Sequence, residues 1–263
     1  MERQVSSGAE AGRFLISLED LDSVIEDQSS GLTTSGNANE EENGQDESGL
    51  LAYWQNIGRR HQVQVPVDMA EPIQQLTRNN QPQDREMVPF ITIGHEKKGD
   101  ELLYEKRQYK KAKWACVTEH EARYEQSTSM GFMKLMKYIC QQNSSGLFLG
   151  LSLPIVTIVH TNQTRSELQP EVTIAYNLPA QFQDQVPQPF DAEIAIEEWP
   201  AHVIYTRPFD GTTNESSILR EINQLSGHLD FPEQIPQDTF IVASYNNPAA
   251  PVRHNEIWFI QRL

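Results

Sequence analysis

The chain has 263 residues, of which 38% are hydrophobic, and a formal net charge of −16. This length suffices for one well-buried domain of about 170 residues with extensions, and the acidic balance argues against nucleic acid or an anionic lipid surface as the main partner. No apolar run approaches the roughly 18 residues of a membrane span. Cys116 and Cys140 lie far apart in apolar patterns typical of buried thiols, so we expect a protein of the reducing cytoplasm.

The acidic charge is concentrated near the N-terminus, where residues 1–50 hold twelve acidic and two basic residues. From Gly31 to Gly49 the chain has almost no apolar residue, so it cannot bury enough surface to offset the cost of ordering. We therefore predict that residues 1–49 form an acidic, largely disordered tail. Within this tail one apolar stripe recurs at helical spacing and is a candidate ligand for a groove on a partner protein, a transient helix without a partner being the alternative: Phe14, Leu18, Leu21 and Ile25.

Residues 50–85 are predicted to be a linker with a short apolar cluster. Three valines alternate after this cluster, and from Ala70 to Gln83 the composition is rich in Pro, Gln, Asn and Asp. The folded domain is therefore predicted to span residues 86–263. The cluster could still dock on this domain, and it consists of Leu50, Leu51, Trp54 and Ile57.

The longest helical pattern of the chain runs from Glu125 to Gln142. Strands are predicted before it at residues 88–93, 101–107 and 113–117, and after it at residues 151–160 and 171–178. In the helix, apolar residues recur at three-and-four spacing on one broad face that must be buried: Phe132, Met133, Leu135, Met136, Ile139 and Cys140.

The second half of the domain repeats the order of the first. Strands are predicted at residues 192–199 and 203–206, then a helix over residues 218–229 that begins with a capping box of Thr212 and Glu215, then strands at residues 240–245 and 256–261. Each half thus reads strand, strand, helix, strand, strand. Two such halves usually join about a pseudo-twofold axis, so the predicted fold class is α+β, with a curved antiparallel sheet or open barrel and two main helices.

The first helix also carries residues that suit a ligand. Met130, Met133 and Met136 lie within two turns, and unbranched thioether side chains either fill irregular core space or adapt to a flat ligand. Residues 97–137 hold ten basic and six acidic residues, which make them the positive stretch of an acidic chain. This stretch is either a solvated face or a rim for the carboxylates of a ligand.

Five segments, in their order and spacing, resemble the SOUL haem-binding protein family. They are YEKRQYKKAKWACVT (Tyr104 to Thr118), GFMKLMKYI (Gly131 to Ile139), LPAQFQ (Leu178 to Gln183), RPFDG (Arg207 to Gly211) and SYNNPAAPVRHNEIWFIQ (Ser244 to Gln261). The resemblance covers roughly residues 88–263. It implies a pseudo-symmetric α+β domain, cytoplasmic residence, no catalytic activity, and haem or free porphyrin held non-covalently in a shallow apolar pocket.

The resemblance also implies site residues. Some family members carry a histidine, proposed as iron ligand, where this chain has Gln108, and an amide is a poor iron ligand. In other members apolar contacts hold the porphyrin, with one basic residue of the first helix and one of the last loop near its propionates. Lys137 matches the first, and Arg253 is near enough in sequence to replace the second. The implied site consists of Met130, Met133, Met136, Lys137, Arg253 and Gln108.

The sequence offers no motif for catalysis or for a metal. Its seven histidines include no pair at metal-binding spacing, and there is no Cys-x-x-Cys, Gly-rich phosphate loop or Gly-x-Ser-x-Gly elbow. We therefore predict a non-enzymatic haem or tetrapyrrole binder that acts as carrier, buffer or sensor. Two alternatives remain open: an interaction protein that has lost haem and recruits a partner through its N-terminal segment, and a binder of another flat apolar ligand.

Overall fold

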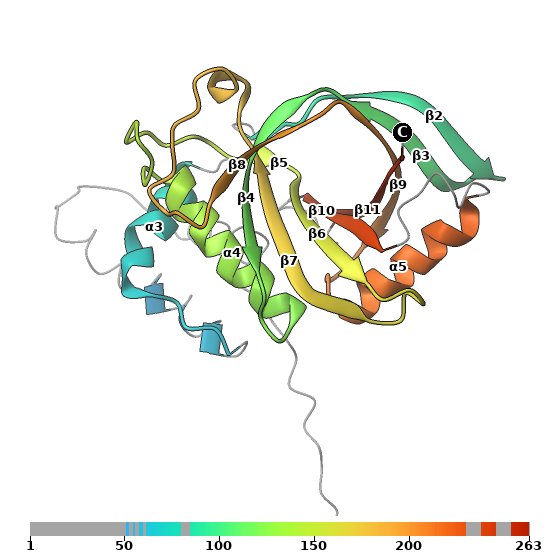
Figure 1. Ribbon diagram of the computed structural model, residues 1–263, viewed down its shortest axis with the longest axis horizontal. Coiled ribbons are helices and arrows are strands. Elements are labelled where there is room, and N and C mark those ends of the chain that lie inside the picture. The colour runs from blue at the N-terminus through green and yellow to red at the C-terminus, as the bar shows by residue number, and fades with distance from the viewer. Residues whose placement is uncertain are drawn as a thin grey trace, which may run out of the picture.

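The structure of the protein is a computed structural model that describes residues 51–52, 55, 58–59, 62–79, 85–229, 238–245 and 254–262 (Figure 1). The predicted partner stripe from Phe14 to Ile25 lies outside these residues, as do Trp54 and Arg253. The described chain is mixed α+β, with helices packed on a large antiparallel sheet, which confirms the predicted class.

Within the described residues the main sheet has nine strands in the order β2-β3-β9-β11-β10-β6-β7-β4-β8, and every neighbouring pair is antiparallel. The strands are β2 (Phe90–Lys98), β3 (Glu101–Tyr109), β4 (Ala112–Glu119), β6 (Ile155–Thr161), β7 (Leu168–Asn177), β8 (Ala195–Trp199), β9 (His202–Asp210), β10 (Thr239–Tyr245) and β11 (His254–Ile260). In this part of the chain β2 and β8 remain edges, so the sheet curves strongly without closing into a barrel (Figure 1).

All of the predicted strands are present, and a short parallel pair, β1 (Glu86–Met87) with β5 (Ser152–Leu153), accompanies them. At the centre of the sheet β10 of the second half pairs with β6 of the first. On either side of this central pair, β11 corresponds to β7, β9 to β4 and β3 to β8, each at the same position in the strand order. The rotation that would relate the two halves stays a prediction.

The edge strand β2 pairs irregularly with β3. Its register shifts between Thr92 and Gly94 and again between Glu96 and Lys97. Ile91 is 56% exposed, and the edge therefore carries apolar surface in the open.

Successive side chains of a strand point to opposite faces of the sheet, which divides the core in two. In β4, Ala115 and Val117 join the larger cluster between sheet and helices, whereas Trp114 and Cys116 join a smaller cluster on the other face. Helix α4 (Tyr124–Ile139) packs on β4 and β7, and helix α5 (Glu215–His228) packs on β3, β9 and β11 (Figure 1). Both predicted helices are therefore confirmed.

The start of α5 differs from the prediction. The side chain of Asn214 accepts a hydrogen bond from the backbone N–H of Ser217 at 2.9 Å, and Ser217 Oγ accepts one from the backbone N–H of Asn214 at 2.9 Å. The capping box predicted for Thr212 and Glu215 is wrong, because this reciprocal pair closes the helix end two residues later.

Helix α4 lies directly against the sheet at Gly131. A Cβ atom at this position would lie 2.5 Å from Ile174 Cδ1 and 3.4 Å from Val117 Cγ1. The missing side chain therefore allows the helix to lie directly on β4 and β7.

The Gly131→Ala variant should lower the free energy of unfolding, although alanine is the better helix former by about 1 kcal/mol. Overpacking against Ile174 costs about 1–3 kcal/mol, which thermal unfolding can detect. The matched control is Gly227→Ala in α5, where no atom lies within 4 Å of the added Cβ and stability should stay equal or rise. Equal stability of the Gly131→Ala and wild-type proteins would show that the Ile174 side chain can move away from the added methyl group without loss of unfolding free energy.

A further described helix lies on α4. The 3₁₀ turn η1 (Val67–Met69) leads into helix α3 (Ala70–Asn79), which packs against α4 on the side away from the sheet (Figure 1). These residues fall in the stretch predicted as a linker, so we propose that the folding unit begins before residue 63 rather than at residue 86. Five side chains of this stretch are buried in the larger core, with exposures of 0–4%: Val63, Val65, Met69, Ile73 and Leu76.

Candidate functional site

The methionine face of α4 points away from the sheet. At about 100° per residue, Met133 and Cys140 lie about 200° and 180° around the helix from Gly131, which faces β7. Met133 and Met136 are fully buried, and Met130 is half-buried. The prediction that the broad apolar face of this helix is buried is confirmed, since Phe132, Met133, Leu135, Met136, Ile139 and Cys140 are 0–5% exposed. Apolar residues between 63 and 76 belong to the same buried cluster.

Two polar contacts join this face to the N-terminal segment. Lys137 Nζ donates to Asp68 Oδ2 at 2.6 Å, and Cys140 Sγ donates to the backbone oxygen of Pro72 at 3.4 Å. Burial, aided by the nearby carboxylate of Glu71, raises the pKa of the Cys140 thiol well above its ordinary value. This cysteine therefore stays a protonated, unreactive thiol while the segment is in place.

A cleft of about 370 Å³ opens beside Met130. Small-molecule sites usually have volumes of about 300–1,000 Å³ and mostly apolar linings. This cleft is within the range of volumes, and its lining mixes three apolar residues with four glutamine or glutamate side chains. Its lining consists of Gln62, Val63, Gln64, Pro66, Glu121, Gln126 and Met130.

The structure does not bring Gln108 to this face. Gln108 is exposed on β3, the strand on which α5 packs, whereas α4 packs on β4 and β7. Arg253 lies outside the described residues, so its place at the site stays a prediction. The described structure thus joins Met130, Met133, Met136 and Lys137 on one helix and leaves Gln108 apart.

Both lysines of α4 are in ion pairs. Besides the contact of Lys137 with Asp68, Lys134 Nζ lies 2.7 Å from Glu119 Oε1 and 2.6 Å from Glu193 Oε2. A carboxylate ligand at this helix would therefore have to replace a carboxylate of the protein itself.

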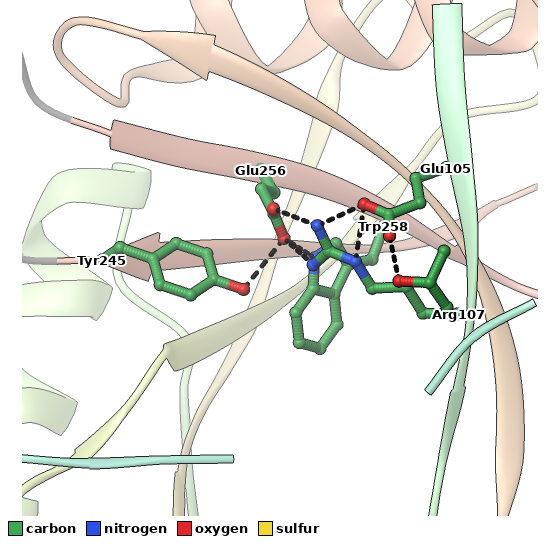
Figure 2. A network of polar contacts seen from close by, with 6 residues as sticks. Glu105, Arg107, Tyr245, Glu256 and Trp258 are labelled. Carbon is green, nitrogen blue, oxygen red and sulfur yellow. Dashed lines mark hydrogen bonds and ion pairs between the residues drawn. The ribbon is translucent and has the colours of Figure 1, made fainter. Parts of the chain in front are cut away.

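The sequence analysis missed a buried ion-pair network at the smaller cluster (Figure 2). Arg107 on β3 donates to both carboxylate oxygens of Glu256 on β11, each at 2.9 Å, and from Nη2 to Glu105 Oε2 at 2.8 Å. Tyr245 Oη at 2.9 Å and Trp258 Nε1 at 2.8 Å also donate to Glu256 Oε2. The guanidinium lies 4.2 Å from the ring centre of Phe90.

The electrostatics of this network favour a structural role. Burial alone would lower the pKa of Arg107, but Glu105 and Glu256 outweigh it and raise that pKa. Burial raises the pKa of Tyr109 to about 12 and raises the pKa of Tyr245 as well. The guanidinium therefore stays charged and both phenols stay protonated near neutral pH.

The described part of the chain has no cluster of side chains suited to bind a metal ion. No three His, Cys, Asp or Glu side chains gather there in a way that could hold a metal ion. Cys116 and Cys140 are free and buried. No helix among the described residues has the length and apolar character needed to cross a membrane.

Fold and contacts together define an α+β domain with a curved antiparallel sheet, a methionine-rich helix face and a separate buried ion-pair network. The model of the family described as "SOUL heme-binding protein" matches residues 85–260. The chain belongs to this family, and the resemblance found in the five sequence segments is confirmed.

The chain is also similar to individual proteins. It is 27% identical to "Heme-binding protein 1" of Mus musculus over 164 residues, which are 62% of this chain and 86% of that protein. It is 26% identical to "Heme-binding protein 2" of Homo sapiens over 170 residues, which are 60% of this chain and 78% of that protein. The solved structure of the EcmrR C-terminal domain matches 61% of this chain and 98% of its own length, at 11% identity and with a TM-score of 0.41.

Proposed function

We propose that this protein binds haem or a related tetrapyrrole non-covalently and catalyses no reaction, acting as a carrier, buffer or sensor. The observation that carries the proposal is membership of the SOUL family over residues 85–260, together with relatives whose names describe heme binding. Two free, buried thiols suit a reducing compartment, so we place the protein in the cytoplasm.

The proposed site is the face of α4 that carries Met130, Met133, Met136 and Lys137. Thioether side chains adapt to a flat apolar ring, and Lys137 supplies a cation for a propionate. The cleft beside Met130 has a mixed lining of polar and apolar side chains, so a macrocycle would also draw on the apolar surface that residues 63–76 cover. Arg253 is proposed as a second cation.

Haemin titrated into the full chain should produce a saturable shift of the Soret band at micromolar concentration. The Met130→Glu variant should bind haemin at least about tenfold more weakly, a difference of 1.4 kcal/mol, because a carboxylate at the half-buried Met130 opposes both the apolar ring and its propionates. Soret titrations of the two proteins measure the difference.

The matched control for this variant is Met87→Glu, since Met87 is 52% exposed on β1 and its replacement should leave haemin affinity unchanged. The Gln108→His variant tests the other placement of the ligand. Its haem spectrum should equal that of the wild type, and a change to a six-coordinate, low-spin form would place the iron at β3 and contradict the α4 site.

A second candidate is an interaction protein that has lost haem. The observation that favours it is the burial of the methionine face under the chain's own residues, combined with the apolar stripe from Phe14 to Ile25 in the acidic tail. Absence of a saturable Soret shift would favour this candidate or a binder of another flat apolar ligand.

A further inference from the structure

Residues 63–79, here called the cover segment, lie on the outer side of α4. The helix is thereby enclosed between the sheet on one side and α3 on the other (Figure 1). Apolar side chains of the cover segment, among them Met69, Ile73 and Leu76, share one buried cluster with Met133 and Met136. The cover segment thus fills the place of a ligand on this face.

The contacts of the cover segment follow a single line along α4. Residues 130, 133, 137 and 140 are spaced at i, i+3, i+7 and i+10, which places them on one face of a helix. Met130 shares its cleft with Val63 and Pro66 of the segment. Lys137 pairs with Asp68, and Cys140 donates to Pro72. Every position of this line is therefore in contact with the cover segment or shares a cleft or cluster with it.

Three features indicate that the cover segment can leave this face. The polar contacts of Asp68 and Pro72 with α4 are weak, because Asp68 is 61% exposed in its pair with Lys137 and a thiol is a poor donor. The apolar burial of the segment is opposed by the cost of ordering the backbone, so the net free energy of docking is a small difference between large terms. The segment also precedes residue 85, where the match to the family model begins.

We propose that the cover segment and a tetrapyrrole compete for the same face of α4. This inference rests on the proposed function and concerns the regulation of that same site. In the closed form the cover segment buries Met133 and Met136 and pairs with Lys137. In the open form the same methionines and the same cation become available to the ring and to a propionate.

Competition predicts that loosening the cover segment tightens haemin binding, because the apparent affinity is the intrinsic affinity multiplied by the open fraction. The Ile73→Ala variant removes a buried side chain from the segment alone and should bind haemin at least about tenfold more tightly in a Soret titration. The Asp68→Asn variant, which changes only an exposed group, should gain up to about fivefold. The matched control is Val67→Ala, since Val67 is 75% exposed and its variant should bind like the wild type.

Hydrogen exchange provides a readout that does not depend on affinity. Saturating haemin should speed the exchange of the backbone amides of residues 70–79 in the full chain, because the displaced helix loses its packing. Slower exchange would show that α3 closes over the ligand and would overturn the proposal.

The titrations separate failure of this inference from failure of the proposed function. If Ile73→Ala and Asp68→Asn bind haemin with wild-type affinity, the ligand binds elsewhere. If they bind haemin more weakly, α3 is part of the binding site. Either result overturns the proposed competition and leaves haem binding itself intact. If no variant shows a saturable Soret shift, the proposed function itself is contradicted.

Discussion

The Arg107→Ala variant should lose about 3–5 kcal/mol of unfolding free energy, because it leaves the buried carboxylate of Glu256 without its cation. The side chain of Glu256 is 4% exposed and would keep only the hydrogen bonds from Tyr245 and Trp258, which do not neutralise its charge. Denaturant unfolding at pH 7 measures the loss.

The matched control is Lys111→Ala. Its pair with Glu198 is 65% and 51% exposed, so its removal should cost at most about 1 kcal/mol. Equal losses in the two variants would show that the Arg107 network contributes no more than a surface pair.

The pH dependence of stability provides a second check on Arg107. Burial raises the pKa of Glu105, but hydrogen bonds from Arg107 and Thr92 outweigh it and hold that pKa below the ordinary value of 4.5. A carboxyl with a lowered folded-state pKa stabilises above its unfolded pKa, and this contribution disappears as pH falls through the folded pKa. The wild type should therefore lose stability as pH falls below 4.5, and Arg107→Ala should lose part of this dependence.

A chain that begins at Arg85 should be less stable than one that begins at Gly49, by at least about 2 kcal/mol. The shorter chain lacks Met69, Ile73 and Leu76, which are 0–2% exposed. Truncating even one buried leucine, isoleucine or methionine to alanine costs at least about 2 kcal/mol of unfolding free energy. For a chain of this size the loss corresponds to a fall in Tm of about 4–8 °C. Thermal unfolding of both chains against full length gives the comparison.

The two truncations also fix the domain boundary. Equal stability of both chains and full length would place the start of the folding unit near residue 86, as the composition of residues 70–83 suggested. A loss in both chains would mean that residues before 49 belong to the folding unit.

Much of the fold could be predicted because its elements carry local periodicity. The apolar stripe of α4 covers a broad part of the helix surface, which predicts that this surface is buried. The stripe does not indicate which segment of the chain covers the side of the helix away from the sheet. Met69, Ile73 and Leu76 do have the spacing i, i+4, i+7. Three residues within a Pro- and Gln-rich stretch are too few for periodicity to distinguish a helix from a linker.

The candidate site was less accessible to sequence reasoning, because its contacts are not local. Lys137 was predicted as a cation, but its partner Asp68 is 69 residues away. Arg107 and Glu256 are 149 residues apart, and although both lie in segments that resemble the family, neither segment indicates that the two side chains meet. Gln108 was assigned by resemblance to a strand position, and only the structure shows that α5 rather than α4 packs on this strand.

The irregular edge strand β2 has a consequence for the behaviour of the protein at high concentration. A straight, exposed strand edge is a template on which other copies can add strands and grow into aggregates. In β2 the two register shifts interrupt that template, and Lys97 and Lys98 place positive charge at its end. The exposed Ile91 can thus remain on an open edge without serving as the seed of an intermolecular sheet.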